Sequence, residues 1–533
     1  MVNSIKTPKS PKVLMISPYF VPRKRVGALR SFKFAKYLKE LDWQVCVVHL
    51  EAKGQTLSDA EKVALEGVAL FTLKTPFDRT INRSGSDLGV AEQHGANQLG
   101  VEKLVESQVK SVLDTSKDNL LKESGSKDLS EAETRNSVKS QAKKDGVNDG
   151  APIQRVIDEF ERYLPMDTWY PLLRSHLNYM EQIIIQEKPD LLWVTADPWS
   201  GLSVVRTLSK RLGIPYIVDF RDPFTLCPIR STKKSSWVQK VEKRLETKVI
   251  QESAAIVFTA NETLKLYQKT YATYAEKMYL IHNAFDNDLF KGADEPEQNT
   301  DPQPDRMLNR HDKALGDTKE PPAGIDSSTS GHQRPSLERN SSNELFKILF
   351  LGKFRSSSPV EPLIESFKVL YKNYPDFFSS LRIYHIGTLE VRIQNELDKL
   401  GFTKHFSSLS PVPYDKVPDF VEEFDGLISL LNPNRNMVIP SKFWDYLPAT
   451  PPIISIGTNP EMDEILTNTQ RGYQFDSVQT QEIANKLYEL GLRRAPYAIT
   501  GETPKGHYER IAGFSAKQKT KELSRLFMSV ITN

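Results

Sequence analysis

Short apolar runs alternate with amphipathic stretches at the start of the chain. Residues 13–17 and 45–49 are dense in aliphatic side chains, and each run predicts a buried strand. Between them, residues 30–41 place Phe34 and Leu38 at helical spacing, which predicts an amphipathic helix. A strand, a helix and a second strand in this order predict one βαβ unit with parallel strands.

The same alternation continues in two later parts of the chain. The earlier part predicts helices over residues 172–186 and 202–212, the second ending at Gly213, and strands over residues 191–195, 216–219, 255–258 and 278–281. The later part predicts strands over residues 347–350, 381–386, 426–430 and 452–456, and helices over residues 360–371, 390–400 and 441–447. Two successive open α/β sheets follow from this pattern. Ligands of such sheets bind outside the carboxyl ends of the strands, so we expect the site in the cleft between two facing sheets.

Two long stretches without any aromatic residue separate these blocks. Residues 78–150 and 291–345 are rich in polar residues, and such segments bury too little apolar surface to offset the entropy of ordering them. We therefore expect a disordered insertion and a disordered linker. The predicted domains are residues 10–77 joined to 151–290, and residues 346–533.

Composition and charge narrow the class of protein. The 533 residues include 71 Lys and Arg against 68 Asp and Glu, a net charge of +3, which argues against a polybasic nucleic-acid binder. The two cysteines, Cys46 and Cys227, provide neither a disulfide framework nor a thiolate metal cluster. With no secretion-signal pattern at the N-terminus and no run of about 18 apolar residues, we expect a cytoplasmic protein.

Charged residues follow several predicted strands of the first block. Gly27 and Arg30 open the helix after the first strand, where backbone N–H groups and an arginine suit a phosphate. Asp197, Arg221 and Asp222 follow two later strands among aromatic residues. A turn-forming aspartate before proline and a structural ion pair are the alternative interpretations of these three. The three-glycine dinucleotide fingerprint is absent from the sequence, which argues against a nicotinamide cofactor.

The second block offers two further groups of candidates. Gly352, Lys353 and Arg355 lie between a predicted strand and a helix, and a glycine with two cations suits a diphosphate. An ordinary polar turn with a serine cap is the alternative. Lys442 and Asp445 are three residues apart on one helix face, where the carboxylate could accept both hydroxyls of a ribose, or where the two could form a surface ion pair.

In their order and spacing these segments resemble a glycosyltransferase of the GT-B fold, close to the family-four-like group that uses nucleotide-sugar donors. The resemblance covers both blocks and rests on residues 13–20 with Gly27 and Arg30, and on residues 190–199, 218–224, 280–286 and 441–452. It implies two Rossmann-like domains facing across a cleft, with the donor site mainly on the C-terminal one and the acceptor site mainly on the N-terminal one. It also implies a last helix that crosses back, for which residues 514–528 are the candidate.

The resemblance also assigns roles to individual residues. Lys353 and Arg355 would neutralise the diphosphate leaving group, and Asp445 would bind the ribose. The full set of expected donor-binding residues is Gly27, Arg30, Gly352, Lys353, Arg355, Lys442 and Asp445, and the expected catalytic residues are Asp197, Arg221 and Asp222. No metal and no cofactor are expected, with the nucleotide-diphosphate sugar as co-substrate.

The sequence departs from the family pattern at two motifs. Of the two glutamates separated by seven residues, Asp445 replaces the second and Met437 stands at the position of the first. The usual Asn-Gly before the linker is Asn283-Ala284. These departures keep open a second hypothesis, a catalytically inactive scaffold or binding subunit with the same fold. An epimerase or a phosphorylase of this fold ranks lower.

The leading prediction is a metal-independent, hexosyltransferase-like enzyme of polysaccharide biosynthesis. It would move a sugar to a hydroxyl of a glycan or of a lipid-linked glycan, with peripheral contact at the inner membrane face. Several basic residues could meet a lipid phosphate or could simply form a solvated helix face, and these are Lys233, Lys234, Lys240, Lys243 and Arg244.

Overall fold

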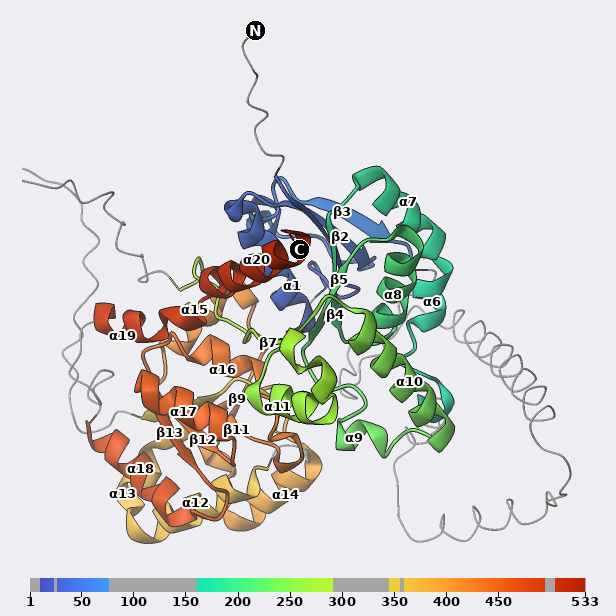
Figure 1. The fold of residues 1–533 in the computed structure, drawn as a ribbon. Helices are drawn as coiled ribbons and strands as arrows, with labels where there is room; N and C mark the ends of the chain where they lie inside the picture. The colour runs from blue at the N-terminus through green and yellow to red at the C-terminus, as the bar shows by residue number, and fades with distance from the viewer. Residues whose placement is uncertain are drawn as a thin grey trace, which may run out of the picture.

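The computed structural model describes residues 10–23, 26–75, 161–290, 345–354, 359–493 and 504–532. These residues form two parallel sheets, each with helices on both faces (Figure 1). The predicted α/β class with two Rossmann-like units is confirmed. The predicted insertion over residues 78–150 and the predicted linker, apart from residue 345, lie outside the described residues.

The N-terminal sheet has seven parallel strands in the order β3-β2-β1-β4-β5-β6-β7. Their bounds are β1 Lys12–Ile16, β2 Gln44–Leu50, β3 Ala69–Leu73, β4 Leu191–Ala196, β5 Tyr216–Phe220, β6 Ala255–Phe258 and β7 Met278–Leu280. Every strand predicted for this block is present, and the additional strand β3 lies at one edge. The chain crosses from one side of β1 to the other between β3 and β4, so the β1/β4 boundary is a topological switch point.

The C-terminal sheet has six parallel strands in the order β10-β9-β8-β11-β12-β13. Their bounds are β8 Phe346–Phe350, β9 Leu381–Ile386, β10 Phe406–Leu409, β11 Gly426–Leu430, β12 Ile453–Ile456 and β13 Gly472–Phe475. The four strands predicted for this block form the four central ones. Here the switch point lies between β8 and β11.

Helices cover both faces of each sheet. In the N-terminal unit they are α1 Val26–Leu38, α2 Asp59–Ala64, α6 Tyr170–Ser175, α7 Leu177–Glu187, α8 Ser200–Leu212, α9 Pro228–Ser231, α10 Ser236–Glu252 and α11 Asn261–Thr270, with 3-10 turns η1 Lys39–Leu41 and η2 Ala272–Lys277. After β8 they are α12 Glu361–Asn373, α13 Pro375–Ser380, α14 Val391–Leu400, α15 Val417–Val421, α16 Ser441–Tyr446, α17 Pro460–Thr469, α18 Thr480–Arg493, α19 Pro504–Ile511 and α20 Ala516–Thr532, with 3-10 turns η3 Thr403–His405, η4 Tyr414–Lys416, η5 Pro433–Arg435 and η6 Ala512–Phe514.

Successive strand residues enter the cores on opposite faces, as the period of two requires. Val13 of β1 joins the core cluster that contains Phe34 of α1, and Leu14 joins the cluster that contains Val205 of α8. In the second sheet, Ile348 and Leu349 likewise enter different clusters. Both sheets are therefore buried on two sides, which explains the nearly continuous apolar runs in the sequence.

One helix prediction was wrong in its extent. The helix predicted over residues 172–186 is two helices, α6 and α7, which meet at His176. The carbonyl oxygen of Leu172 lies 3.3 Å from the His176 amide nitrogen and 2.9 Å from its ring Nδ1. Both segments bury apolar side chains against the same core, among them Leu173 and Met180. The hydrophobic period therefore continues across the break, and the period alone does not locate it.

The last helix returns to the first domain. In Figure 1, α20 (red) lies beside α1 (blue), although the two stand at opposite ends of the chain. Leu523 and Phe527 of α20 belong to the core cluster that contains Val13 of β1. The Trp43 indole Nε1 donates a hydrogen bond of 2.8 Å to the Ser524 hydroxyl. Residues from both ends of the chain thus complete one core.

The carboxyl ends of the two sheets face each other. Asp222, two residues after β5, accepts a hydrogen bond of 2.7 Å from Arg435 of η5, which follows β11. The Thr263 hydroxyl at the start of α11 donates to the carbonyl oxygen of Met437 at 2.7 Å. The loops after the strands are therefore the surfaces through which the two units meet.

Candidate functional site

Glycines line the carboxyl edge of the C-terminal sheet. Gly352, Gly387 and Gly457 follow β8, β9 and β12 within two residues of each strand end. Gly387 and Gly457 have φ angles of 74° and 113°, in the region that favours glycine. A built Cβ would meet Lys442 at Gly352, Lys353 at Gly387 and Leu431 at Gly457, so the missing side chains make room for neighbouring residues of the chain.

Two predicted lysines lie against two of these glycines. A Cβ built on Gly352 would stand 2.9 Å from the Lys442 Nζ, so the ammonium group of α16 rests over that glycine. A Cβ built on Gly387 would stand 2.5 Å from the Lys353 Cε, so the Lys353 stem crosses Gly387. The structure therefore brings Gly352, Lys353 and Lys442 to one edge of the sheet. Arg355 lies outside the described residues.

Asp445 belongs to a polar cluster between the two domains. Its carboxylate accepts a hydrogen bond of 3.3 Å from the Tyr414 hydroxyl. Burial raises the pKa of Asp445, although the charges of Lys33 and Lys442 and the hydrogen bond from Tyr414 act against this shift. Lys33 of α1 is itself buried, donates to the Ala284 carbonyl at 2.7 Å and has a pKa lowered by burial. That Asp445 binds ribose stays a prediction.

Arg221 and Gly27 meet at the carboxyl edge of the N-terminal sheet. The Arg221 Nε donates to the Ala196 carbonyl at 3.1 Å, and its Nη2 donates to the Asp197 carbonyl. A Cβ built on Gly27 would stand 2.3 Å from the Arg221 Nη1. The absence of a side chain at Gly27 is thus what allows the guanidinium group to lie under the first turn of α1.

Replacing Gly27 with alanine should displace this guanidinium group. Because the new methyl group would overlap Arg221, we expect the rate of a reaction that uses this edge to fall about tenfold, as geometry at the site is lost. The melting temperature should change little, since Arg221 is partly exposed and can shift. Steady-state kinetics and thermal unfolding of the variant measure both effects. Gly513→Ala, at a glycine without a positive φ and with nothing within 4 Å of a built Cβ, is the control for a general glycine effect. Unchanged kinetics in Gly27→Ala would show that the position of Arg221 is unimportant.

Asp197 has a second carboxylate as its neighbour. Asp167 accepts hydrogen bonds from the Ser200 amide and hydroxyl, both at 2.8 Å, at the start of α8. Burial raises the pKa of Asp167 to about 6; the Ser200 hydrogen bonds oppose this rise and the charge of Asp197 adds to it. Asp197 therefore lies beside a group that changes charge near neutral pH.

The raised pKa of Asp167 predicts a pH dependence of stability. The folded state binds the proton more tightly than the unfolded state, so this group stabilises the fold at low pH and loses that contribution as pH rises through about 6. We expect the free energy of unfolding of the native protein, relative to Asp167→Asn, to fall by about 1–2 kcal/mol between about pH 4 and 7. Denaturant unfolding of both proteins across this range measures the difference. A difference that is constant with pH, or that grows as pH rises, would contradict the assignment.

Arg30 is held inside the N-terminal domain. Its Nε and Nη2 donate to the buried carboxylate of Asp219, the shortest contact being 2.7 Å. It also donates to the carbonyls of Ile281 and His282 and to the side-chain oxygen of Asn283. Its side chain is 5% exposed and that of Asp219 is 0% exposed. These contacts favour a structural role, and donor binding by Arg30 stays a prediction.

Known proteins resemble this chain in one sequence segment and in overall fold. Residues 138–289 match the model of Glycosyltransferase Family 4. Sucrose-phosphate synthase from Thermosynechococcus elongatus superposes with a TM-score of 0.55 at 9% identity, over 98% of this chain and 99% of that one. A glycosyltransferase from Rickettsia africae gives a TM-score of 0.53 at 11% identity, over 98% of this chain and 99% of that one.

The chain has the GT-B fold, and its part over residues 138–289 is similar to Glycosyltransferase Family 4. A trehalose-6-phosphate protein from Escherichia coli, bound with UDP-2-fluoro glucose, gives a TM-score of 0.51 at 9% identity, over 97% of this chain and 98% of that one. A comparison with curated proteins gives no significant match.

Several contacts of this GT-B protein were not predicted from its sequence. Glu461, at the start of α17, lies with its Oε1 2.7 Å from the His282 Nε2 and accepts a hydrogen bond of 2.7 Å from the Asn261 amide. The His282 ring packs against Trp444 and Phe514 with centroids 5.5 and 5.7 Å apart. These residues come from distant parts of the chain, so no local pattern could join them. Gly387 and Gly457 carried a usable signal, since each closely follows a predicted strand, as Gly352 does.

Two kinds of feature are absent from the part of the chain that the structure describes. Among the described residues, no group of three or more His, Cys, Asp or Glu side chains could hold a metal ion. Within the same residues, none of the helices has the length and apolar character needed to cross a bilayer.

Proposed function

We propose that this protein is a glycosyltransferase that moves a sugar from a nucleotide-diphosphate sugar to a hydroxyl of a glycan or lipid-linked glycan in polysaccharide biosynthesis. The observation that carries the proposal is the glycine-lined edge of the C-terminal sheet, with Lys353 and Lys442 lying over Gly387 and Gly352. The family-four match and the fold shared with a protein that binds UDP-2-fluoro glucose support the same donor class.

The diphosphate of the donor would occupy this edge. Breaking the bond between the sugar and the diphosphate leaves negative charge on the phosphate oxygens, and that charge is greater in the transition state than in the bound donor. Two ammonium groups held at fixed positions therefore stabilise the transition state more than the ground state, which raises the rate. The glycines make room for the two lysine side chains at the edge where the phosphates would bind.

The N-terminal edge would hold the acceptor hydroxyl. Asp197, Arg221 and Asp222 are the proposed catalytic residues, and Gly27 is the point where this edge approaches the donor. The guanidinium group of Arg221 donates to the carbonyls of Ala196 and Asp197, which supports the proposal because these contacts give its charge a defined position at this edge. Asp222 forms an ion pair with Arg435, which ties this edge to the C-terminal domain.

The finer parts of the proposal concern the type of reaction. We propose a hexosyltransferase-like reaction without a resident metal or cofactor, with the two lysines supplying the positive charge that a metal would otherwise provide. We further propose that the enzyme works in the cytoplasm, in peripheral contact with the inner membrane face. The acceptor would then be reached from the cytoplasmic side.

Thermal unfolding in the presence of nucleotides tests the donor class. A ligand at about 100 times its dissociation constant adds about 2.7 kcal/mol of stability, so a panel of nucleotide diphosphates and nucleotide sugars should give a shift that depends on the base. The shift should weaken in Asp445→Ala if this residue binds the ribose. A panel without any shift would contradict the proposed donor site. Binding without release of nucleotide from any donor would instead identify an inactive binding subunit.

A further inference from the structure

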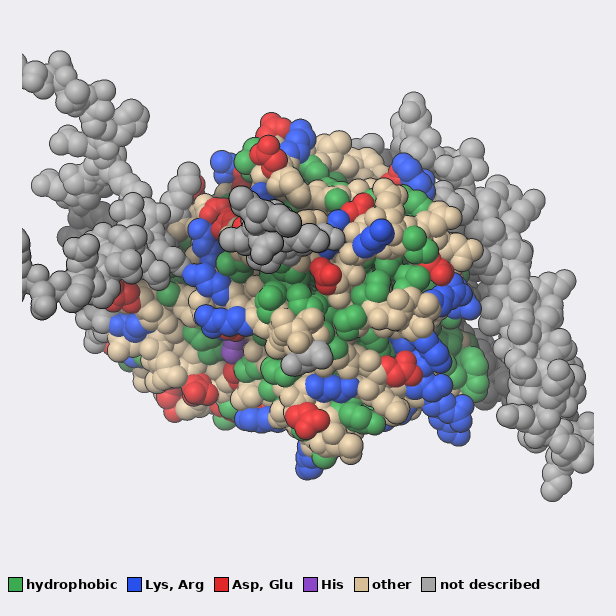
Figure 2. All heavy atoms as spheres, turned by 45° about the horizontal axis from the view of Figure 1, so that its top comes forward, with side chains coloured by type: hydrophobic (Ala, Val, Ile, Leu, Met, Phe, Trp, Pro, Cys, Tyr) green, Lys and Arg blue, Asp and Glu red, His purple; other side chains and the backbone are tan. Residues whose placement is uncertain are grey.

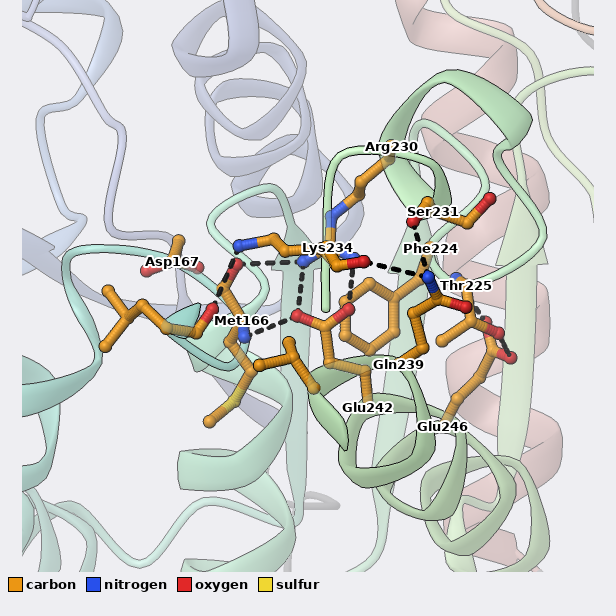
Figure 3. Close-up of polar contacts among 12 residues, drawn as sticks. Met166, Asp167, Phe224, Thr225, Arg230, Ser231, Lys234, Gln239, Glu242 and Glu246 are labelled. Atoms are coloured by element: carbon orange, nitrogen blue, oxygen red, sulfur yellow. Dashed lines mark hydrogen bonds and ion pairs between the residues drawn. The ribbon is translucent and has the colours of Figure 1, made fainter. Parts of the chain in front are cut away.

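Helix α10 of the N-terminal domain buries two of its three acidic residues and exposes several basic ones. The third acidic residue, Glu252, is exposed at the end of the helix and pairs with Arg206. Helix α10 carries two acidic residues in its middle turns, Glu242 and Glu246, which are 2% and 0% exposed. Figure 3 shows both side chains rising from α10 toward Met166, Arg230 and Thr225. Buried carboxylates need partners, and these two have several.

Glu242 is satisfied by the segment before α6 and by α9. Its carboxylate accepts a hydrogen bond of 2.6 Å from the Met166 amide. It also accepts hydrogen bonds from both terminal nitrogens of Arg230. Arg230 in turn donates to the Met166 carbonyl at 2.9 Å, and its guanidinium group lies 4.6 Å from the centroid of the Phe224 ring. The negative charge of Glu242 is therefore neutralised by Arg230 inside the domain.

Glu246 is satisfied by the loop after β5 and by α11. It accepts hydrogen bonds from the Thr225 amide at 3.1 Å and from the hydroxyls of Tyr267 and Tyr271 at 2.5 and 2.6 Å. Lys243 lies beside the same carboxylate, with its Nζ 3.5 Å from the Glu246 Oε2, and donates a hydrogen bond of 2.8 Å to the Tyr271 hydroxyl. Neither glutamate contributes negative charge to the outer surface of α10.

The outer surface of α10 is basic and carries an exposed indole. Trp237, Lys240, Arg244 and Lys248 are all exposed and stand at positions i, i+3, i+7 and i+11, which lie on one side of a helix. Trp237 is 59% exposed. Lys233, just before the helix, is exposed as well. We define these five residues as the α10 stripe.

A neighbouring segment extends the stripe with the same chemistry. Arg162 is exposed, and Tyr163 is 51% exposed. The Arg162 carbonyl accepts a hydrogen bond of 3.0 Å from the Ser235 amide, at the N-cap of α10. Lys234, just before α10, donates hydrogen bonds of 2.6 and 2.9 Å to the carbonyls of Glu161 and Leu164, which link this segment to the start of α10. In Figure 2, Lys and Arg side chains (blue) gather along the right-hand edge, the side on which Figure 1 shows α8 and α10.

We propose that the α10 stripe, with Arg162 and Tyr163, docks the protein on an anionic phospholipid bilayer. Indole and phenol rings prefer the depth of the lipid headgroups, and lysine and arginine beside them attract anionic phosphates. A double-stranded nucleic acid would use the cations but would offer no unstacked base to the indole, and the net charge of +3 argues against a nucleic-acid binder. The stripe lies on the proposed acceptor domain, so docking would bring a lipid-linked acceptor to this domain. Docking on a bilayer rests on the proposed function, but vesicle binding can be measured without any assay of sugar transfer.

Co-sedimentation with vesicles tests the proposal. The full chain should bind vesicles of phosphatidylcholine mixed with phosphatidylglycerol, and should bind vesicles of phosphatidylcholine alone much more weakly. The triple variant Lys240→Ala, Arg244→Ala, Lys248→Ala should bind the mixed vesicles about 100-fold more weakly. Trp237→Ala should bind about tenfold more weakly, since a large apolar side chain no longer enters the headgroup layer. Added salt should weaken binding further, because exposed charges are screened.

A matched triple variant separates this site from net charge. Lys372, Lys399 and Lys404 are exposed lysines of the C-terminal domain, and replacing them with alanine removes the same charge elsewhere. This control should bind mixed vesicles as the native chain does. Equal loss in both triple variants, or no preference for phosphatidylglycerol, would overturn the proposal. Binding to heparin or RNA without binding to vesicles would overturn it in favour of a nucleic-acid surface. Nucleotide-induced thermal shifts of the stripe variants should stay native, so a failure of docking is distinguishable from a failure of the donor site.

Discussion

Replacing Lys353 and Lys442 together with alanine should lower the rate of sugar transfer by about 100- to 1,000-fold, the range seen when a group that stabilises transition-state charge is removed. Both ammonium stems lie against glycines at the carboxyl edge of the C-terminal sheet. Since the charge on the diphosphate grows as the sugar leaves, kcat should fall more than the affinity for the nucleotide diphosphate. Initial-rate kinetics and calorimetric titration with the nucleotide measure the two quantities.

The appropriate control removes equal charge from the same domain. Lys399 and Lys404 are exposed and come from α14 and η3, away from the glycines, and their double alanine variant should keep native kinetics. An arginine at position 442 should recover part of the rate, since the charge remains while its shape differs. Native kcat in the Lys353→Ala, Lys442→Ala variant would place the diphosphate elsewhere.

Asp219→Ala should lower the free energy of unfolding by about 3–5 kcal/mol, because it leaves the buried Arg30 without its counter-charge. The carboxylate of Asp219 accepts both the Nε and the Nη2 of Arg30, and neither side chain has appreciable exposure. The Thr195 hydroxyl, 3.3 Å from the same carboxylate, would lose its partner as well. Denaturant unfolding of the variant and of the native protein gives the difference.

Two further variants decide whether the uncompensated charge is the cause. Asp59→Ala breaks the exposed pair between Lys62 and Asp59 on the same domain and should leave the unfolding curve unchanged. The double variant Arg30→Met, Asp219→Leu should recover much of the loss, since an apolar pair of similar volume replaces the ion pair. If the double variant is as unstable as Asp219→Ala, the cost arises from packing and not from charge.

The strands and the glycine–lysine edge could be predicted because their signals are local. Strands buried on two faces appear as apolar runs, and this made β8 and β12 visible in the sequence. Gly352 and Lys353 directly follow such a run, so their place at the strand end followed from the fold class alone. Lys442 reaches the same edge from helix α16. The resemblance to a family could indicate this position, but the pattern of apolar and polar residues could not.

The remaining contacts depend on residues that are distant in the sequence. Arg30 was predicted to bind phosphate from its position in the helix after the first strand. Its observed partner, Asp219, stands 189 residues away, and no local sequence pattern indicates such a buried pair. The contact of Glu461 with His282 joins residues 179 positions apart, across two domains. The break between α6 and α7 at His176 was missed for a different reason, since a hydrophobic period reports the face of a helix and not its continuity.

The return of α20 to the first domain has a consequence for synthesis of the chain. Phe527 packs against Trp43 with ring centroids 5.4 Å apart, and the two residues belong to one core. Domains usually fold as units while the ribosome proceeds, with the N-terminal one first. Here the first sheet emerges early, yet the face beside α1 keeps apolar side chains open to water until α20 has left the ribosome. The N-terminal domain thus begins to fold before the C-terminal sheet is synthesised and completes its core only after that sheet.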